Sequence, residues 1–293
     1  MKLNLSVGVV AQKSEAELQT MRVGGLIWQN IRDYLVDSVK PGMSLKEVEK
    51  LTKAQFGKYG VVSSFDKSGD FPSIMCLSLN DCVVHGAASE ELIRPGDKLT
   101  LDFGFSYLGL NIDAAFSMFF HPEKEEEKTL GRGGIKKLEE YSYLDQLTKA
   151  LFYEAISGLK AGELTGAITE RIENFFCKYF PKKYSLLEKF TGHGIGKKLH
   201  EFPRVHNFGM RKVEGVALPV NSTICIEPMI IEQKDGSWIQ REGDCGVYAK
   251  DRNAQTLHYE HLVAVKADGV EVLTASLQEM RELKSTWELV KKL

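Results

Sequence analysis

The sequence predicts an α+β protein built from two similar halves with a functional site between them. The order helix, turn, helix, sheet occurs twice along the 293 residues. A Pro-Gly pair at 41–42 separates the first two helices, and an Ala-Gly pair at 161–162 separates the second two. This period is far longer than the 20–50 residues of solenoid repeats. We therefore expect one domain over 1–293, with halves at 13–120 and 141–274.

The first half begins with two helices. Apolar residues recur at helical spacing across 14–38, and the Pro-Gly pair ends that helix. Ser44, followed three positions later by Glu47, is typical of the capping box that opens a second helix. After Gly60 the pattern changes to short apolar runs that predict strands, the last two being KLTLDFGF and LNIDAAFSMFF.

The second half repeats this order. A helix is predicted at about 143–159, a second in LTGAITERIENFFCKY, and a β-rich region from Pro181 to about residue 273. Residues 121–140 combine an acidic run, glycines and a basic patch, which predicts a solvated linker between the halves. The tail, 275–293, has an apolar stripe at helical spacing, so we expect a helix that docks on the domain.

Composition excludes several classes of protein. Lys and Arg total 38 against 40 Asp and Glu, a balance that argues against a broad basic face for nucleic acid. No apolar run approaches the roughly 18 residues of a membrane span, and the first residues lack a signal-peptide core. Five cysteines without a C-x-x-C pair predict reduced thiols. We expect a cytoplasmic protein that binds neither membrane nor nucleic acid directly.

Asp102 and Asp113 are the first candidate site residues. Each interrupts a strongly apolar strand, where an unpaired carboxylate is costly. If the two strands form a hairpin that turns around residues 107–108, the two aspartates face each other. Adjacent carboxylates repel unless a proton or a cation lies between them. For this pair alone, strand-end carboxylates paired with lysine or backbone donors remain an alternative.

His193, Glu227 and Glu260 extend this set. His193 stands between glycines in TGHGIGKKLH, and Glu227 and Glu260 lie in the apolar runs STICIEPMI and LHYEHLVAV. Carboxylates with a single imidazole suit divalent Mn, Fe, Co, Zn or Mg better than a thiolate site does. Five ligands, two of them able to bridge, suit two ions about 3.5–4 Å apart, as in two-metal hydrolases.

Order, spacing and residue identity together resemble the type I methionine aminopeptidases of the pita-bread metallopeptidase family. The resemblance runs from about residue 15 to 274 and is carried by ELQTMRVGG, KPGMSLKEVE, CLSLNDCVVHG, GDKLTLDFG, GHGIGKKLHEFP, ICIEPM and YEHLVAV. It implies the pita-bread fold, with two pseudo-symmetric helix-helix-sheet halves and the metal site between them. It also implies removal of the initiator methionine from nascent chains by a monomer, with the ribosome as a candidate partner.

The resemblance implies a role for each matched residue of the metal site. Asp102 would chelate one ion, Asp113 and Glu260 would bridge both, and His193 and Glu227 would complete the other. The ions would be Mn, Fe, Co or Zn.

Further matched residues would act on the substrate. Glu227 would shuttle a proton, His200 would stabilise the oxyanion, and His85 would contact the peptide near the scissile bond. A family site for one monovalent cation would map to Asn80, Cys82 and Thr256.

The substrate pocket departs from the family pattern. Its matched positions are Phe65, Ser68, Phe71, Cys76, Leu199 and Cys245. Ser68 stands for an expected aromatic residue, Phe65 for a small thiol, Leu199 for a phenylalanine and Cys245 for a tryptophan. The remaining aromatic side chains still form a wall that suits a thioether, so methionine is the expected residue to be removed.

Two alternatives remain at the level of sequence. An X-Pro peptidase of the same fold generally carries a large extra N-terminal domain, whereas about 13 residues precede the first helix here. A non-catalytic binding module of this fold usually loses metal ligands, whereas all five are present.

Overall fold

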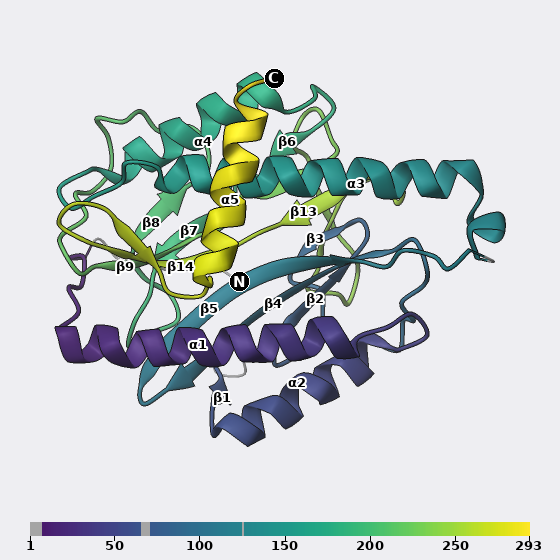
Figure 1. Ribbon diagram of the computed structural model, residues 1–293, viewed down its shortest axis with the longest axis horizontal. Helices are drawn as coiled ribbons and strands as arrows, with labels where there is room; N and C mark the ends of the chain where they lie inside the picture. Colours follow the sequence, from purple (N-terminus) through teal and green to yellow (C-terminus); the bar gives the residue numbers. More distant parts are fainter. Residues whose placement is uncertain (1–7, 66–70, 125) are drawn as a thin grey trace.

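The computed structural model describes residues 8–65, 71–124 and 126–293. The helices are α1 Glu15–Ser38, α2 Leu45–Tyr59, α3 Glu126–Ile156, α4 Thr165–Tyr179 and α5 Leu277–Val290. Figure 1 shows α1 and α2 on one side of the strands and α3 and α4 on the other, with α5 lying across α3. None of the helices in the described ranges has an apolar stretch able to span a bilayer.

Fifteen strands are assigned within these ranges. Those of the first half are β1 Val62–Ser63, β2 Cys76–Leu79, β3 Cys82–Val84, β4 Lys98–Tyr107 and β5 Leu110–Phe119. Those of the second half are β6 Ser185–Leu186, β7 Thr191–Gly194, β8 Glu201–His206, β9 Thr223–Ile226, β10 Met229–Ile231, β11 Ile239–Gln240, β12 Val247–Tyr248, β13 Thr256–His258, β14 His261–Val265 and β15 Val270–Val272.

The two halves are built alike around their glycine turns. Gly42 N donates to Ile93 O, and Gly162 N donates to Leu218 O, at 2.8 Å in both cases. Both glycines have positive φ, 93° and 90°, a conformation that glycine adopts without a steric penalty. The predicted capping box at Ser44 is present as well. The predicted duplication is therefore confirmed at the level of individual hydrogen bonds.

The two main sheets meet at one point. In the first half β4 lies between β2 and β5, and in the second half the order is β15-β14-β9-β7-β8. A bridge joins β5 to the start of β14: Glu260 N donates to Ala115 O at 3.0 Å, and Ala115 N donates to Glu260 O at 3.2 Å. The metal-site residues predicted from the sequence surround this junction.

The β4–β5 hairpin corrects the predicted register. Asp102 pairs with Ala115, and Asp113 pairs with Gly104, so the two aspartates are diagonal neighbours rather than directly opposite. The turn lies at Leu108 and Gly109, both with positive φ, as a two-residue hairpin loop requires. Because the register differs from the predicted one by two residues, both carboxylates still lie on the same face of the sheet.

The segment 121–140 was predicted to be a solvated linker, but most of it is helical. Residues 126–140 form the first part of α3, which breaks at Gly131, where φ is 67° and ψ 175°. Leu138 and Tyr141 are buried and continue the apolar face of the helix at a spacing of three residues. The burial of these two side chains explains why the segment is helical, and the many charged residues around them hide this apolar spacing in the sequence.

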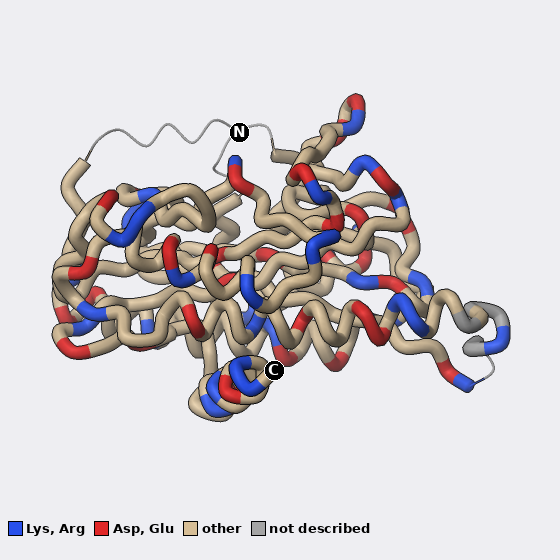
Figure 2. The backbone as a smooth tube through the Cα atoms, turned by 90° about the horizontal axis from the view of Figure 1, so that it is seen from above, with Lys and Arg blue, Asp and Glu red and all other residues tan. Residues whose placement is uncertain are grey.

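The C-terminal helix docks on the domain as predicted. Leu283 and Val290 of α5 are buried against the core under α3, and the Trp287 indole donates to the Glu154 carboxylate of α3. In the view from above, positive and negative residues are interspersed along the chain (Figure 2). This distribution agrees with the near-neutral charge balance of the sequence.

Candidate metal centre

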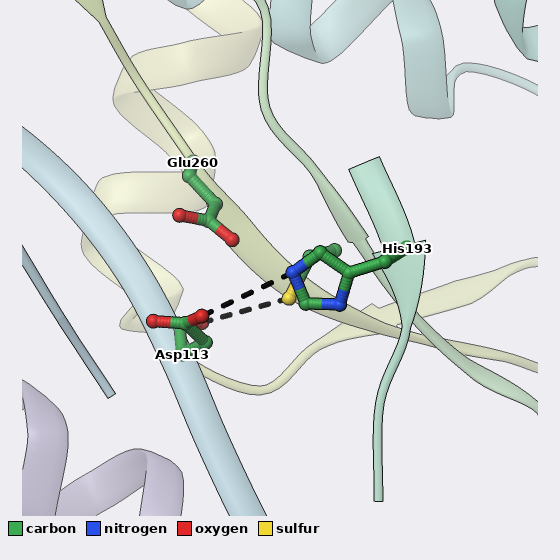
Figure 3. Close-up of side chains that lie close together, drawn as sticks. Asp113, His193 and Glu260 are labelled. Carbon is green, nitrogen blue, oxygen red and sulfur yellow. Dashed lines mark hydrogen bonds and ion pairs between the residues drawn. The ribbon is translucent and has the colours of Figure 1, made fainter. Parts of the chain in front are cut away.

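Five predicted ligands converge where the two sheets meet. Asp102 lies on β4, Asp113 on β5 and His193 on β7, while Glu227 directly follows β9 and Glu260 precedes β14. All five are buried, with no more than 8% of any residue exposed. Figure 3 shows the side chains of Asp113 from β5, His193 from β7 and Glu260 from just before β14 turned toward one another.

The distances between these side chains are those of ligands around shared ions. His193 Nε2 lies 3.5 Å from Glu227 Oε1 and 4.0 Å from Asp113 Oδ2. Ligand atoms bound at about 2.0–2.2 Å to one ion lie roughly 3–4.3 Å apart. Asp113, His193 and Glu260 offer atoms that lie within 4.8 Å of one another. The set therefore fits divalent metal.

The orientation of His193 is fixed by its backbone surroundings. Its Nδ1 donates to Gly194 O at 2.9 Å, which leaves the lone pair of Nε2 directed at the carboxylates. A Cβ on Gly192 would lie 2.2 Å from Cys225 O, and one on Gly194 would lie 2.3 Å from Phe202 O. The two flanking glycines thus allow β7 to pass close to its neighbours with the imidazole facing the site.

Among the described residues, the buried carboxylates have too few opposite charges and hydrogen-bond donors to stabilise their ionised form. Burial raises the pKa of Asp102 to about 7 and raises the pKa values of Asp113, Glu227 and Glu260 well above the usual range. Mutual repulsion raises the last three further. Asp113 Oδ1 and Glu260 Oε1 have no hydrogen-bond partner within the described ranges. A cation between these groups would remove both costs.

We predict that the affinity for divalent metal rises steeply with pH. The raised carboxyl pKa values mean that protons occupy the site near pH 6 and must be displaced by the ion. His193 adds no such proton, because burial lowers its pKa to about 3. Each displaced proton gives about a tenfold gain in affinity per pH unit. Calorimetric titration with Mn²⁺ at pH 6, 7 and 8 measures this gain, and equal affinity at pH 6 and 8 would contradict it.

The predicted metal ligands, catalytic residues and substrate-pocket residues within the described ranges line one cavity of about 320 Å³. They are Phe65, Phe71, Cys76, His85, Asp102, Asp113, His193, Leu199, His200, Glu227, Cys245 and Glu260. Ser68 lies outside the described residues. Val84 and Gln240 also line the cavity and were not predicted. Gln240 lies in a region of short strands and turns, where the sequence pattern does not show which side chains face inward.

One wall of the cavity is aromatic. The rings of Phe65 and Phe71 meet edge to face, with centroids 6.3 Å apart. His85 lies 6.5 Å from Phe71 and 5.6 Å from Phe190 between ring centroids, and its φ is 61°. A non-glycine residue in that conformation is uncommon and is found more often at functional sites.

His200 stands beside the metal ligands. Its ring meets that of His193 edge to face, with centroids 4.5 Å apart. Burial lowers the pKa values of His200 and His85 to about 4, so both imidazoles are neutral at pH 7. A neutral imidazole offers one N–H donor and one acceptor to a substrate.

The region predicted for a monovalent cation holds the side chain of Lys98 instead. Lys98 is fully buried, and its Nζ donates to Ser78 O and Cys82 O at 3.1 Å and to Thr256 Oγ1 at 3.0 Å. Burial lowers the pKa of Lys98 to about 7, and these oxygen acceptors, with Thr100 Oγ1 as a fourth at 3.4 Å, stabilise the protonated form. The ammonium group of Lys98 occupies the place predicted for a separate cation. The sequence did not indicate this role, because a lysine at the start of a strand is ordinary.

We predict that the unfolding temperature of the wild-type chain is the same in KCl and in choline chloride at pH 6.5. Lys98→Met should lower it by several degrees, because each unpaired buried acceptor costs about 1–3 kcal/mol. Lys46→Met is the control, since the Lys46 ammonium group forms an exposed ion pair with Glu90. A higher unfolding temperature of the wild-type chain in KCl than in choline chloride would show that Lys98 does not replace the ion.

Comparisons with known proteins agree with this geometry. Residues 19–267 match the model of metallopeptidase family M24. The methionine aminopeptidase of Mycoplasma capricolum is 30% identical over 268 residues, which cover 91% of this chain and 98% of the relative. The crystal structure of methionine aminopeptidase from Thermotoga maritima has a TM-score of 0.78 at 26% identity and covers 92% of this chain and 100% of that one. The X-Pro aminopeptidase of the same organism shares the fold, with a TM-score of 0.64 at 20% identity over 90% of this chain and 62% of that one.

Proposed function

The chain belongs to metallopeptidase family M24, and from this premise we propose that it removes the initiator methionine from the N-termini of nascent polypeptides. The observation that carries the proposal is the convergence of all five predicted metal ligands in one buried cavity, in a chain that matches methionine aminopeptidases over nearly its full length. A non-catalytic binding module would not need to retain this set of buried carboxylates.

The five ligands would hold two divalent ions drawn from Mn, Fe, Co and Zn. Asp113 and Glu260 come from the two strands joined at the sheet junction, which suits them to contact both ions. Asp102 would complete one position, and His193 and Glu227 the other. When bound, such ions supply Lewis-acid activation of water and of the scissile carbonyl.

The protein's own groups would move protons and orient the peptide. Burial raises the pKa of Glu227 well above its usual range, so this carboxyl group is suited to accept a proton from water and deliver it to the leaving amine. His200, neutral and beside His193, would donate to the carbonyl oxygen that becomes negative. His85 would contact the peptide nitrogen or a carbonyl near the scissile bond.

The apolar part of the cavity would select the first residue. Phe65, Phe71 and Leu199 supply carbon surface, and Cys76 and Cys245 supply sulfur. Such a lining favours an unbranched thioether, since sulfur makes favourable contacts with aromatic rings. The substrate would reach this cavity as the free N-terminus of a peptide, with the enzyme acting as a cytoplasmic monomer near the ribosome.

The test of this proposal is a panel of peptides that differ at their first residues. With Mn²⁺ or Co²⁺ present, Met-Gly-Met-Met should be cleaved at least about 100-fold faster than the peptides that begin with Ala or Leu, if the pocket discriminates by some 3 kcal/mol. Equal rates on all peptides would refute the methionine assignment. Preferential cleavage of X-Pro peptides would favour the X-Pro peptidase, which shares the fold but is a longer chain.

A further inference from the structure

His258 is a buried histidine that neither the sequence pattern nor the five-ligand site accounts for. It lies at the end of β13, two residues before Glu260. Its exposed fraction is 1%, and neither Nδ1 nor Nε2 has a hydrogen-bond partner in the part of the chain that the structure describes. Buried polar atoms are nearly always paired, so two unpaired nitrogens on one imidazole point to a partner that the described side chains do not supply.

The position of the ring identifies what that is. His258 Nε2 lies 3.9 Å from Glu227 Oε2 and 3.9 Å from Glu260 Oε2. These distances are too long for hydrogen bonds, but they fall within the roughly 3–4.3 Å that separates two ligands of one ion. Glu227 therefore directs one oxygen toward His193 and the other toward His258.

The main chain at His258 is held from two sides. His258 pairs with Met229 of β10, and its carbonyl oxygen accepts from Ser117 Oγ of β5 at 3.3 Å. The backbone at His258 is thus fixed by a strand pairing and by a contact with the opposite half of the molecule, and the ring that it carries lies beside Glu227 and Glu260.

We propose that His258 is a further metal ligand, whose Nε2 binds a divalent ion together with Glu227 and Glu260. The inference rests on the proposed metal site and extends it to a second imidazole. Imidazole nitrogen suits Zn²⁺ and Fe²⁺, whereas carboxylates alone suit Mg²⁺ and Mn²⁺. The second imidazole therefore shifts the preference of this site toward Zn²⁺.

Metal titration of the full-length chain tests the proposal without using peptide hydrolysis. Metal-stripped wild type, His258→Gln and His258→Leu are titrated calorimetrically with Zn²⁺ and with Mn²⁺. Both variants should bind Zn²⁺ at least about tenfold more weakly, and the loss for Mn²⁺ should be smaller. The visible spectrum of the Co²⁺-loaded protein should change, because the number of nitrogen ligands changes.

Two control variants show what unchanged and weakened metal binding look like. His121→Gln replaces an exposed histidine and should leave both affinities unchanged, whereas His193→Gln should weaken binding of both metals. In the metal-free state His258→Leu should be at least as stable as wild type, because it removes two unpaired buried nitrogens. This comparison separates loss of a ligand from loss of the fold.

Wild-type Zn²⁺ affinity and an unchanged Co²⁺ spectrum in both His258 variants would overturn the inference, provided that His193→Gln binds metal weakly. The inference would equally fail if the variants changed only the KM for peptide, since His258 would then contact substrate. Wild-type affinity in His193→Gln as well would show that the proposed five-ligand site, on which the inference rests, is itself wrong.

Discussion

Replacing Glu260 by alanine abolishes peptide hydrolysis, with kcat lower by on the order of 10³-fold or more, the scale on which loss of an essential catalytic group acts. The carboxylate is the one expected to contact both ions, and its oxygen Oε1 has no other partner within the described ranges. The fold should survive, because Glu260 joins the two sheets through its backbone N–H and carbonyl rather than through its side chain.

The measurement is kcat on a methionine peptide, together with the metal content and the circular dichroism of the purified variant. His193→Ala should behave in the same way. Glu271→Ala is the matched control, since Glu271 is a glutamate of the second half that pairs with Arg22 away from the site. Wild-type turnover in Glu260→Ala or His193→Ala would contradict the assignment of metal ligands.

Glu227→Gln should lower kcat by about 10²–10⁴-fold, the range for loss of a general acid–base group. The amide keeps the size of the side chain and one oxygen, but it neither accepts nor delivers a proton. Because the pKa of Glu227 is raised by burial, the pH–rate profile should also lose the limb that reports this group.

The matched control for this variant is Glu232→Gln. Glu232 lies five residues further along the chain and pairs with Lys183 outside the cavity. The comparison requires kcat across pH 5–9 for both variants and the wild type. A Glu227→Gln enzyme with kcat within threefold of the wild type and an unchanged profile would mean that the proton passes through another group.

The site could be predicted from the sequence because its residues violate the usual pattern of their surroundings. A carboxylate in an apolar strand is costly, so Asp102, Asp113, Glu227 and Glu260 stand out against their neighbours. His193 stands out through its two glycines. The structure places these five residues together. The first two helices begin after Ser14 and Ser44 because each serine caps its helix through contacts with a glutamate three residues later, and such local contacts can be inferred from sequence.

The features that could not be predicted depend on contacts between residues distant in sequence or on which two residues form the β4–β5 turn. The hairpin register depends on whether the turn begins at Tyr107 or at Leu108, and both choices fit the alternation of side chains. Lys98 and His258 resemble ordinary strand residues until Thr256 and Glu227 approach from other strands. His258 did carry one signal, since residues i and i+2 of a strand share a face and Glu260 had already been identified.

Release of N-terminal methionine at this buried site should depend on divalent metal. The most direct measurement is the free methionine released from Met-Gly-Met-Met by metal-stripped protein as Mn²⁺ or Co²⁺ is returned. No release is expected in the presence of a chelator, and the rate should rise until two equivalents of metal are bound. Equal release without metal, or no release although metal binds, would contradict this expectation.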